Sequence, residues 1–394
     1  MSTVKATNFQ NTSSSTVNMV TDASGNVSFG NAITVAGNTT ITGSLVPSSS
    51  YLRNRIINGD MRVDQRNAGA SVTNISGGVY TVDRWAAYAN QASKFTIQRN
   101  AGAVTPPSGF VNYLGVTSSS AYSVLSGDEF DVRQVIEGLN ISDLDWGTAS
   151  AATVTLSFWV RSSLTGTFGG ALANSAFNRS YPFTYTISVA NTWEKKTVTI
   201  AGDTSGTWLT TNGIGIDVFF SLGAGTTYSG TAGAWAGSGF ITATGAVSVV
   251  GTSGATLYIT GVQLEVGTVA TPFERQIYNA QLAQCQRYFC KSYDLATVPG
   301  TATNTGASAT AIYSAAFNGT GTLNLIFPVE MRSAPTVVNY SSVNASTTGK
   351  CSSPTVDYNV NAANANTRQA YVSATSSGGN GSQLFYQWTA AAEL

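Results

Sequence analysis

Short segments in which apolar and polar residues alternate, separated by turns of Gly, Ser and Asn, constrain the fold of this chain more than any other feature. In the segment TVTLSFWV, the alternation places four apolar side chains on one face and Trp159 on the other. The four are Val154, Leu156, Phe158 and Val160. Comparable segments follow one another through the middle of the chain without helical periodicity between them. We therefore expect an antiparallel β-sandwich there.

The composition excludes several classes of function. Histidine is absent, which removes the Ser-His-Asp triad, the Cys-His dyad and the common zinc motifs. With 19 basic and 19 acidic residues, the formal net charge is +0, so we expect no nucleic-acid partner. The sequence has no apolar stretch of about 18 residues and no signal-peptide pattern at its N-terminus. We expect a soluble protein that is made in a cytoplasm and does not insert into a membrane.

Residues 1–50 differ from the rest of the chain because they contain no Trp or Tyr and repeat a short unit. The unit is a Gly-Asn turn followed by alternating residues, GNVSF at 25–29 and GNTTI at 37–41. The segment is either a disordered tail or a thin β-structure whose core several chains share, since a lone hairpin is marginal in water. We favour the second and expect a parallel homotrimer that attaches to a larger assembly through this segment. The shared apolar positions would be Val27, Phe29, Ile33, Val35, Ile41 and Leu45.

Beyond Pro272 the periodicity becomes that of a helix. Thr271 and Glu274 resemble a capping box, with Pro272 at the first helical position. Apolar residues then recur at spacings of 4, 3 and 4, which places them on one face. We predict a linking helix over residues 274–293 with a packing face of Tyr278, Leu282, Cys285 and Phe289. The three cysteines, Cys285, Cys290 and Cys351, lack the spacing of a disulfide framework and are expected to be buried free thiols.

Four strand-like segments follow one another in a recognisable order. They are SFWV at 157–160, the strand from Trp193 to Ile200, GIDVFFSL at 215–222 and LYITGVQL at 257–264. This order resembles that of jelly-roll carbohydrate-binding modules and related galactose-binding-like domains. A longer series that includes RNRIINGDMRVDQRN, YTVDRW, QLEVGTVATPFE and CQRYFCKSY resembles bacteriophage tail-fibre and related virion proteins over residues 51–340. The resemblance implies a virion component, usually trimeric, that binds the host surface.

Together these patterns predict a mainly β protein. Its expected parts are an N-terminal thin β segment (1–50), a central jelly-roll β-sandwich (51–273), one linking α-helix (274–293) and a C-terminal β domain (294–394). The last part, of about 100 residues, is large enough for its own small core.

Two tryptophans bracket the segment WEKKTVTIAGDTSGTW at residues 193–208. Large aromatic residues usually pack in a core, and we expect this of Trp193, which begins the strand. An exposed ring in a polar loop can instead stack on the apolar face of a sugar. On this hypothesis the glycan-binding candidates are Trp208, after the GDTSG turn, and Tyr228 and Trp235, in a Gly-rich stretch. For these three the core interpretation stays open.

Charged residues gather in three places. One acidic group contains Asp128, Glu129, Asp131 and Glu137, and a second contains Asp143 and Asp145. Two such carboxylates could hydrolyse a glycoside, but solvated turns or ion pairs with Arg133 are far commoner, and we predict no catalytic residue. The third group, in which Asp60 and Asp64 alternate with arginines, is expected to form ion pairs at a subunit or domain junction; its arginines are Arg53, Arg55, Arg62 and Arg66. No cofactor is expected; a structural calcium ion is compatible with the acidic loops, without assigned ligands.

These inferences converge on a non-enzymatic bacteriophage fibre subunit. We expect a homotrimeric virion component that joins other virion proteins through its N-terminus and contacts a host-surface glycan during adsorption. Two alternatives stay open: a capsid-decorating or tail-adaptor protein without a receptor role, and a glycan-degrading tailspike that uses two of the carboxylates above.

Overall fold

The chain divides into two compact units, Met1–Ser50 and Tyr51–Leu394. The computed structural model describes residues 8–9, 19–21, 27–29, 53–311, 319–376 and 383–394. In the first unit, three short strands form an antiparallel sheet: β1 (Asn8–Phe9), β2 (Met19–Thr21) and β3 (Val27–Phe29). Val27 and Phe29, two of the predicted trimer positions, are the ends of β3. The other four, Ile33, Val35, Ile41 and Leu45, lie outside the described residues.

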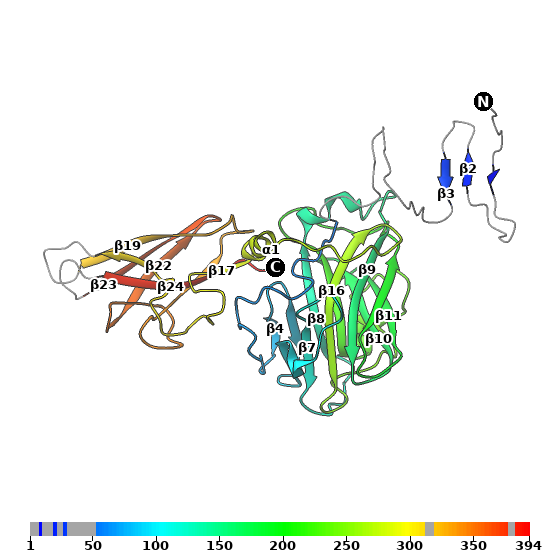
Figure 1. The fold of residues 1–394 in the computed structure, drawn as a ribbon, viewed down its shortest axis with the longest axis horizontal. Coiled ribbons are helices and arrows are strands. Elements are labelled where there is room, and N and C mark those ends of the chain that lie inside the picture. Colours follow the sequence, from blue (N-terminus) through cyan, green and yellow to red (C-terminus); the bar gives the residue numbers. More distant parts are fainter. Residues whose placement is uncertain (1–7, 10–18, 22–26, 30–52, 312–318, 377–382) are drawn as a thin grey trace. The chain divides into compact units, whose positions relative to one another are not determined.

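The second unit begins with a sandwich of two antiparallel sheets, which confirms the predicted fold class (Figure 1). The six-stranded sheet has the order β11 (Ser180–Ile187), β10 (Gly166–Ala173), β13 (Ile214–Ala224), β8 (Glu129–Glu137), β5 (Ala86–Ala89) and β4 (Gly77–Tyr80). The five-stranded sheet has the order β12 (Glu194–Ile200), β9 (Val154–Ser162), β16 (Thr256–Val266), β7 (Leu114–Ser118) and β6 (Phe95–Arg99). From β7 to β10 the chain changes sheet at every step, as in a jelly roll.

Smaller elements connect these strands. They are the parallel pair β14 (Ser229–Gly230) and β15 (Thr242–Ala243), and the 3₁₀ turns η1 (Ala101–Ala103), η2 (Gly138–Asn140), η3 (Ser142–Leu144) and η4 (Thr226–Tyr228).

The alternation read from the sequence determines which side chains form the core of the sandwich. The four apolar residues of β9 are fully buried, while Trp159 between them is only partly buried, as predicted. The rings of Phe158 and Phe220 meet edge to face across the two sheets, with centroids 5.0 Å apart. Trp193, which we expect in the core, is only partly buried and packs against a small cluster outside the main core: its ring lies 5.5 Å from that of Tyr113, and its Nε1 donates to the carbonyl of Thr105.

The helix differs from the prediction. Helix α1 (Tyr278–Gln286) is much shorter than the expected 274–293, and Phe289 belongs instead to strand β17 (Phe289–Lys291). Its buried residues are Gln281 and Cys285, whereas Tyr278 is 40% exposed and Leu282 is partly buried. The predicted packing face is therefore wrong except for Cys285 and the buried Phe289. The chain leaves the helix after Gln286 and enters strand β17 at Phe289, so the helical period does not extend to Phe289.

The predicted capping box is also absent. The residue before the helix is Ile277, which makes no side-chain cap. The Thr271 hydroxyl donates instead to Glu265 Oε2 at 2.6 Å, so this residue fastens the chain to the end of β16.

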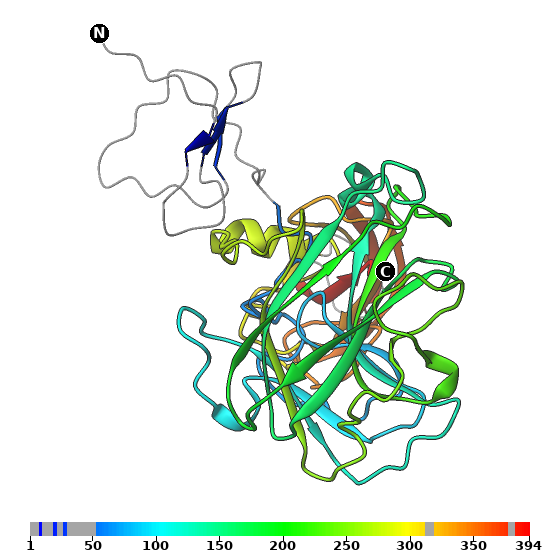
Figure 2. The same cartoon turned by 90° about the vertical axis from the view of Figure 1, so that its right-hand side faces the viewer.

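Outside the sandwich, the C-terminal strands form a further β layer with its own core (Figures 1 and 2). Strand β24 (Gln383–Ala391) is its centre, because β17, β18, β20 and β21 all pair with it. The other strands are β18 (Ser308–Ala311), β19 (Gly319–Ile326), β20 (Thr336–Tyr340), β21 (Lys350–Ser352), β22 (Asp357–Ala365) and β23 (Gln369–Ser376). All three cysteines are buried free thiols, as predicted.

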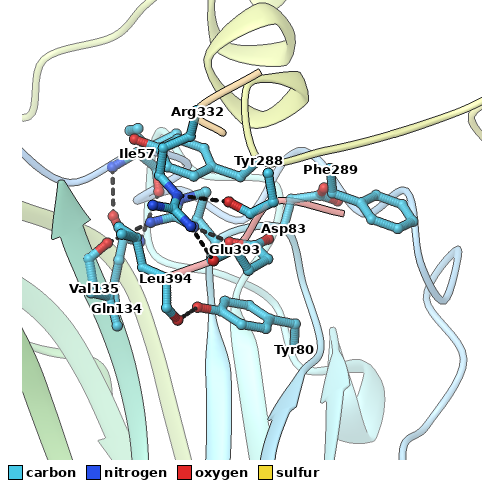
Figure 3. Close-up of polar contacts among 12 residues, drawn as sticks. Ile57, Tyr80, Asp83, Gln134, Val135, Tyr288, Phe289, Arg332, Glu393 and Leu394 are labelled. Carbon is cyan, nitrogen blue, oxygen red and sulfur yellow. Dashed lines mark hydrogen bonds and ion pairs between the residues drawn. The ribbon is translucent and has the colours of Figure 1, made fainter. Parts of the chain in front are cut away.

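Charged side chains connect this layer to the sandwich, and Figure 3 shows part of the connection. Arg66 Nη2 donates to Glu393 Oε1 at 2.9 Å, and Arg287 Nη2 donates to Glu137 Oε1 at 2.6 Å. The other predicted junction arginines also form ion pairs: Arg53 with Glu265, Arg55 with Asp143 and Arg62 with Asp60. The expectation of ion pairs at a domain junction is thus confirmed for Arg66. The other three pairs lie within the sandwich and its leading segment.

Candidate functional site on the outer face of the six-stranded sheet

Strand β8 carries charged side chains on the face of the sheet that points away from the core. Its alternate residues Phe130, Val132 and Ile136 are buried in the core, so Glu129, Asp131 and Arg133 lie on the outer face. The register sets Arg133 opposite Ala86 of β5 and Phe219 of β13, and Asp131 opposite Tyr88 of β5. Three adjacent strands thus bring charges and aromatic rings together.

Arg133 is held firmly at the centre of this face. Its Nε and Nη2 donate to the two oxygens of Asp131 at 2.8 and 2.9 Å, and Nη2 also lies 3.2 Å from Glu129 Oε1. Its guanidinium carbon lies 4.7 Å from the ring centre of Tyr88 and 4.8 Å from that of Phe219. Glu129 and Asp131 are therefore ion-pair partners of Arg133, the interpretation favoured above over a catalytic pair.

A cavity of about 240 Å³ opens beside Arg133. It is lined by Gly78, Tyr80, Ala86, Tyr88, Arg133, Val135, Ile214, Asp217 and Leu394. Two of these lining residues are bonded to each other: the Tyr80 hydroxyl donates to the Leu394 carbonyl at 2.8 Å, and Figure 3 shows this contact with Val135 nearby. The walls are mainly apolar and aromatic, with a small number of polar groups, which is the usual make-up of a small-molecule site.

Asp217 is the polar group in this cavity whose bonding is incomplete. Its residue is 8% exposed, and its Oδ1 is buried without a hydrogen-bond partner among the described residues. Burial, opposed by Arg133 and reinforced by Asp131, raises the pKa of Asp217 to about 7. A buried carboxylate oxygen without a donor is costly, so the site offers a ready acceptor to any ligand that brings a donor.

The neighbouring carboxyl groups of Glu129 and Asp131 also have raised pKa values. Burial first and then Asp131 raise the pKa of Glu129 to about 7, and burial raises the pKa of Asp131 itself. Three carboxylates therefore face one guanidinium on this surface. Burial is the main reason that these carboxyl groups hold their protons more tightly, and Arg133 offsets it only in part.

The structure corrects the prediction that Trp208 is an exposed ring. Trp208 is only 7% exposed, and its ring meets those of Trp146 and Trp235 edge to face at 4.7 and 5.4 Å. Its Nε1 lies 3.3 Å from Asp203 Oδ2, so the polar edge is bonded as well. A ring enclosed in this way cannot stack on a sugar. The GDTSG turn suggested exposure, but tryptophans from two other segments cover the ring.

The other two aromatic candidates are partly buried. Trp235 also contacts Trp146 and Tyr181, at 5.3 Å each, and its Nε1 donates to the Ala201 carbonyl. Tyr228 packs near Phe177 and contributes, after burial and Glu129, to the raised pKa of Tyr88. Tyr228 therefore borders the outer face described above, whereas Trp235 lies in a separate tryptophan cluster. Their role in glycan binding stays a prediction.

The acidic groups of the sequence do not converge on one site. Asp128 accepts the Tyr122 hydroxyl and the Leu125 backbone N–H in a turn, and Glu137 pairs with Arg287. Asp143 pairs with Arg55, and Asp145 is exposed. Among the described residues, no group of three or more acidic or cysteine side chains is arranged to hold a metal ion.

Sequence reasoning missed Asp217, Tyr80 and Tyr88. One local signal was available, because Asp217 interrupts the apolar run IGIDVFF, where a charge on a buried strand requires an explanation. The two tyrosines carry no such signal, since only the pairing of β4, β5, β8 and β13 brings them beside Asp217.

Comparisons with known proteins are remote. No protein-family model and no curated protein matches the chain. Among solved structures, it is similar to the enzymatically active domain of tailspike protein 4 from bacteriophage CBA120, with 12% identity and a TM-score of 0.32 over 54% of this chain and 21% of that chain. A CBM4 structure matches with 14% identity and a TM-score of 0.27, over 47% of this chain and 95% of that chain. A family 11 carbohydrate-binding module from Clostridium thermocellum matches with 9% identity and a TM-score of 0.25, over 50% and 97% respectively.

Similarities at this level assign neither a family nor a ligand. In the part of the chain that the structure describes, we find no helix with the length and apolar character needed to cross a bilayer.

Proposed function

We propose that this protein binds a carbohydrate, without cleaving it, in the cavity on the outer face of the six-stranded sheet. The observation that carries the proposal is the pairing of aromatic walls with an unsatisfied carboxylate. Tyr80 and Tyr88 offer apolar ring surface, and Asp217 Oδ1 offers a buried acceptor. Sugars present both an apolar face and hydroxyl donors, so this combination suits them.

We further propose that the protein is a homotrimeric bacteriophage fibre subunit located in the virion, and that the glycan belongs to the host surface. Support comes from the sequence resemblance of residues 51–340 and from the segment 1–50, whose apolar residues a single chain cannot enclose. In this proposal the N-terminal segment joins other virion proteins, and the following domains contact the host.

Glycan binding is tested with the full-length protein on an array of bacterial surface glycans. Tyr88→Ala should lose binding, because it removes a wall of the cavity. Tyr371→Ala is the matched control, since Tyr371 is a 43% exposed tyrosine of the C-terminal domain. Retained binding by Tyr88→Ala would remove this cavity as the site.

The same preparation separates the alternatives. A protein that binds no glycan but is found on particles would be a decorating or adaptor protein. Release of reducing ends from a bound polysaccharide would identify a glycan-degrading tailspike. The virion role is tested by immunogold labelling of particles assembled with the full-length protein or with a variant that lacks residues 1–50. The variant should stay soluble but no longer enter particles.

A further inference from the structure

We propose that the cavity selects a sugar that carries a free, positively charged amino group and rejects acidic sugars. This inference rests on the proposed function and specifies the chemical class of its ligand. Two geometric observations carry it: the bonding of Arg133 and the position of Asp217.

Arg133, the cation of this face, is already neutralised. Asp131 binds its guanidinium with both oxygens, and Glu129 makes a third contact. The guanidinium is also enclosed between the rings of Tyr88 and Phe219. It is therefore poorly placed to bind the carboxylate of a uronic or sialic acid as well.

Asp217 adds a further carboxylate, and Arg133, which already binds Asp131 and Glu129, does not hydrogen-bond the Asp217 Oδ1. Its Oδ1 lacks a partner although the residue is 8% exposed, and it lines the cavity directly. With Glu129 and Asp131 this makes three carboxylates against one guanidinium. An ammonium group in the cavity would supply both the missing donor and the missing positive charge. A ligand carboxylate would instead add negative charge beside three buried acidic groups.

The walls define the rest of the ligand. Tyr80 and Tyr88 line the cavity, with Ala86, Val135 and Ile214 completing its apolar surface. The volume of about 240 Å³ lies below the roughly 300–1,000 Å³ of pockets for drug-sized ligands. The cavity therefore fits one sugar unit of a longer glycan, and aromatic surface next to an ammonium is itself favourable.

Three trisaccharides test the inference by calorimetry with the full-length protein at low salt: glucosamine, its N-acetylated form and galacturonic acid. We expect the glucosamine trisaccharide to bind most tightly, and its affinity to fall as salt is added. Asp217→Asn should weaken it by about tenfold or more, because a charge-assisted hydrogen bond is lost. Asp145→Asn, the same change at an exposed aspartate, should leave the affinity unchanged.

The outcomes distinguish this inference from the proposed function. Equal binding of the glucosamine and N-acetylglucosamine forms, or tighter binding of the galacturonate form, would overturn the charge preference while glycan binding stands. Full affinity in Asp217→Asn would likewise overturn it. If no glycan of any class binds on the array, the proposed function fails as well.

Discussion

Glu393 forms an ion pair with Arg84, a side chain that is 1% exposed and lies 309 positions earlier in the sequence. The Arg84 guanidinium carbon also lies 3.6 Å from the ring centre of Tyr288, and its Nη2 donates to the Val135 carbonyl. Burial alone would lower the pKa of Arg84, but Glu393 and the surrounding tyrosines hold it above its ordinary value. Glu393, near the C-terminus, thus provides the counter-charge for an arginine buried in the sandwich.

Glu393→Gln should therefore be strongly destabilising. Removing one partner of a buried ion pair costs about 3–5 kcal/mol, since Arg84 stays charged in a buried place. Glu330→Gln is the matched control, because its partner Arg368 is 78% exposed and exposed pairs contribute about 1 kcal/mol at most. Urea unfolding of both variants measures the difference. Equal losses of stability would show that the buried pair has no special role.

Trp208→Ala should destabilise the sandwich, whereas truncation of an exposed tryptophan would have little effect. Truncating a buried tryptophan costs about 3–5 kcal/mol, and here it also removes two aromatic contacts. Trp193→Ala, at a partly buried tryptophan, should cost less. Thermal unfolding compares the two. A Trp208→Ala variant that melts with the wild type would contradict its place in the core.

The sequence predicts the core of the sandwich better than it predicts the candidate site, for a physical reason. The alternation in β9 is local, and a two-residue period alone assigns Phe158 to the core and Trp159 to the other face. The environment of Asp217 is not local, because Tyr80, Arg133 and Leu394 reach it through strand pairing and through the C-terminal chain. Trp208 shows the same limit: its turn is local, but the tryptophans that bury it come from elsewhere.

Helix α1 offers a direct test of which face is buried. Cys285→Asn should lower stability by about 1–3 kcal/mol, the cost of a buried amide without partners, because Cys285 is fully buried. Leu282→Asn should cost less, since Leu282 is only partly buried. Chemical denaturation of the two variants decides the point. A larger loss in Leu282→Asn would restore the packing face predicted from the spacing.

The ionisation of Asp217 should make the protein less stable as the pH rises. Burial raises its pKa from 3.8 to about 7, opposed by Arg133 and reinforced by Asp131, and Tyr80, Tyr88 and Glu129 lie on the same face. The folded state therefore holds this proton more tightly than the unfolded state, so stability falls between the ordinary pKa and about pH 7. Asp217→Asn stays neutral throughout. It should come closest to the wild type below about pH 4, where Asp217 is protonated in both states, and exceed its melting temperature near about pH 8. Asp145→Asn, at an exposed site, should show no such pH-dependent gain. If the melting temperatures of Asp217→Asn and the wild type differ by the same amount at both pH values, Asp217 does not titrate in this range. That result would contradict the unsatisfied state of its Oδ1 in this structure.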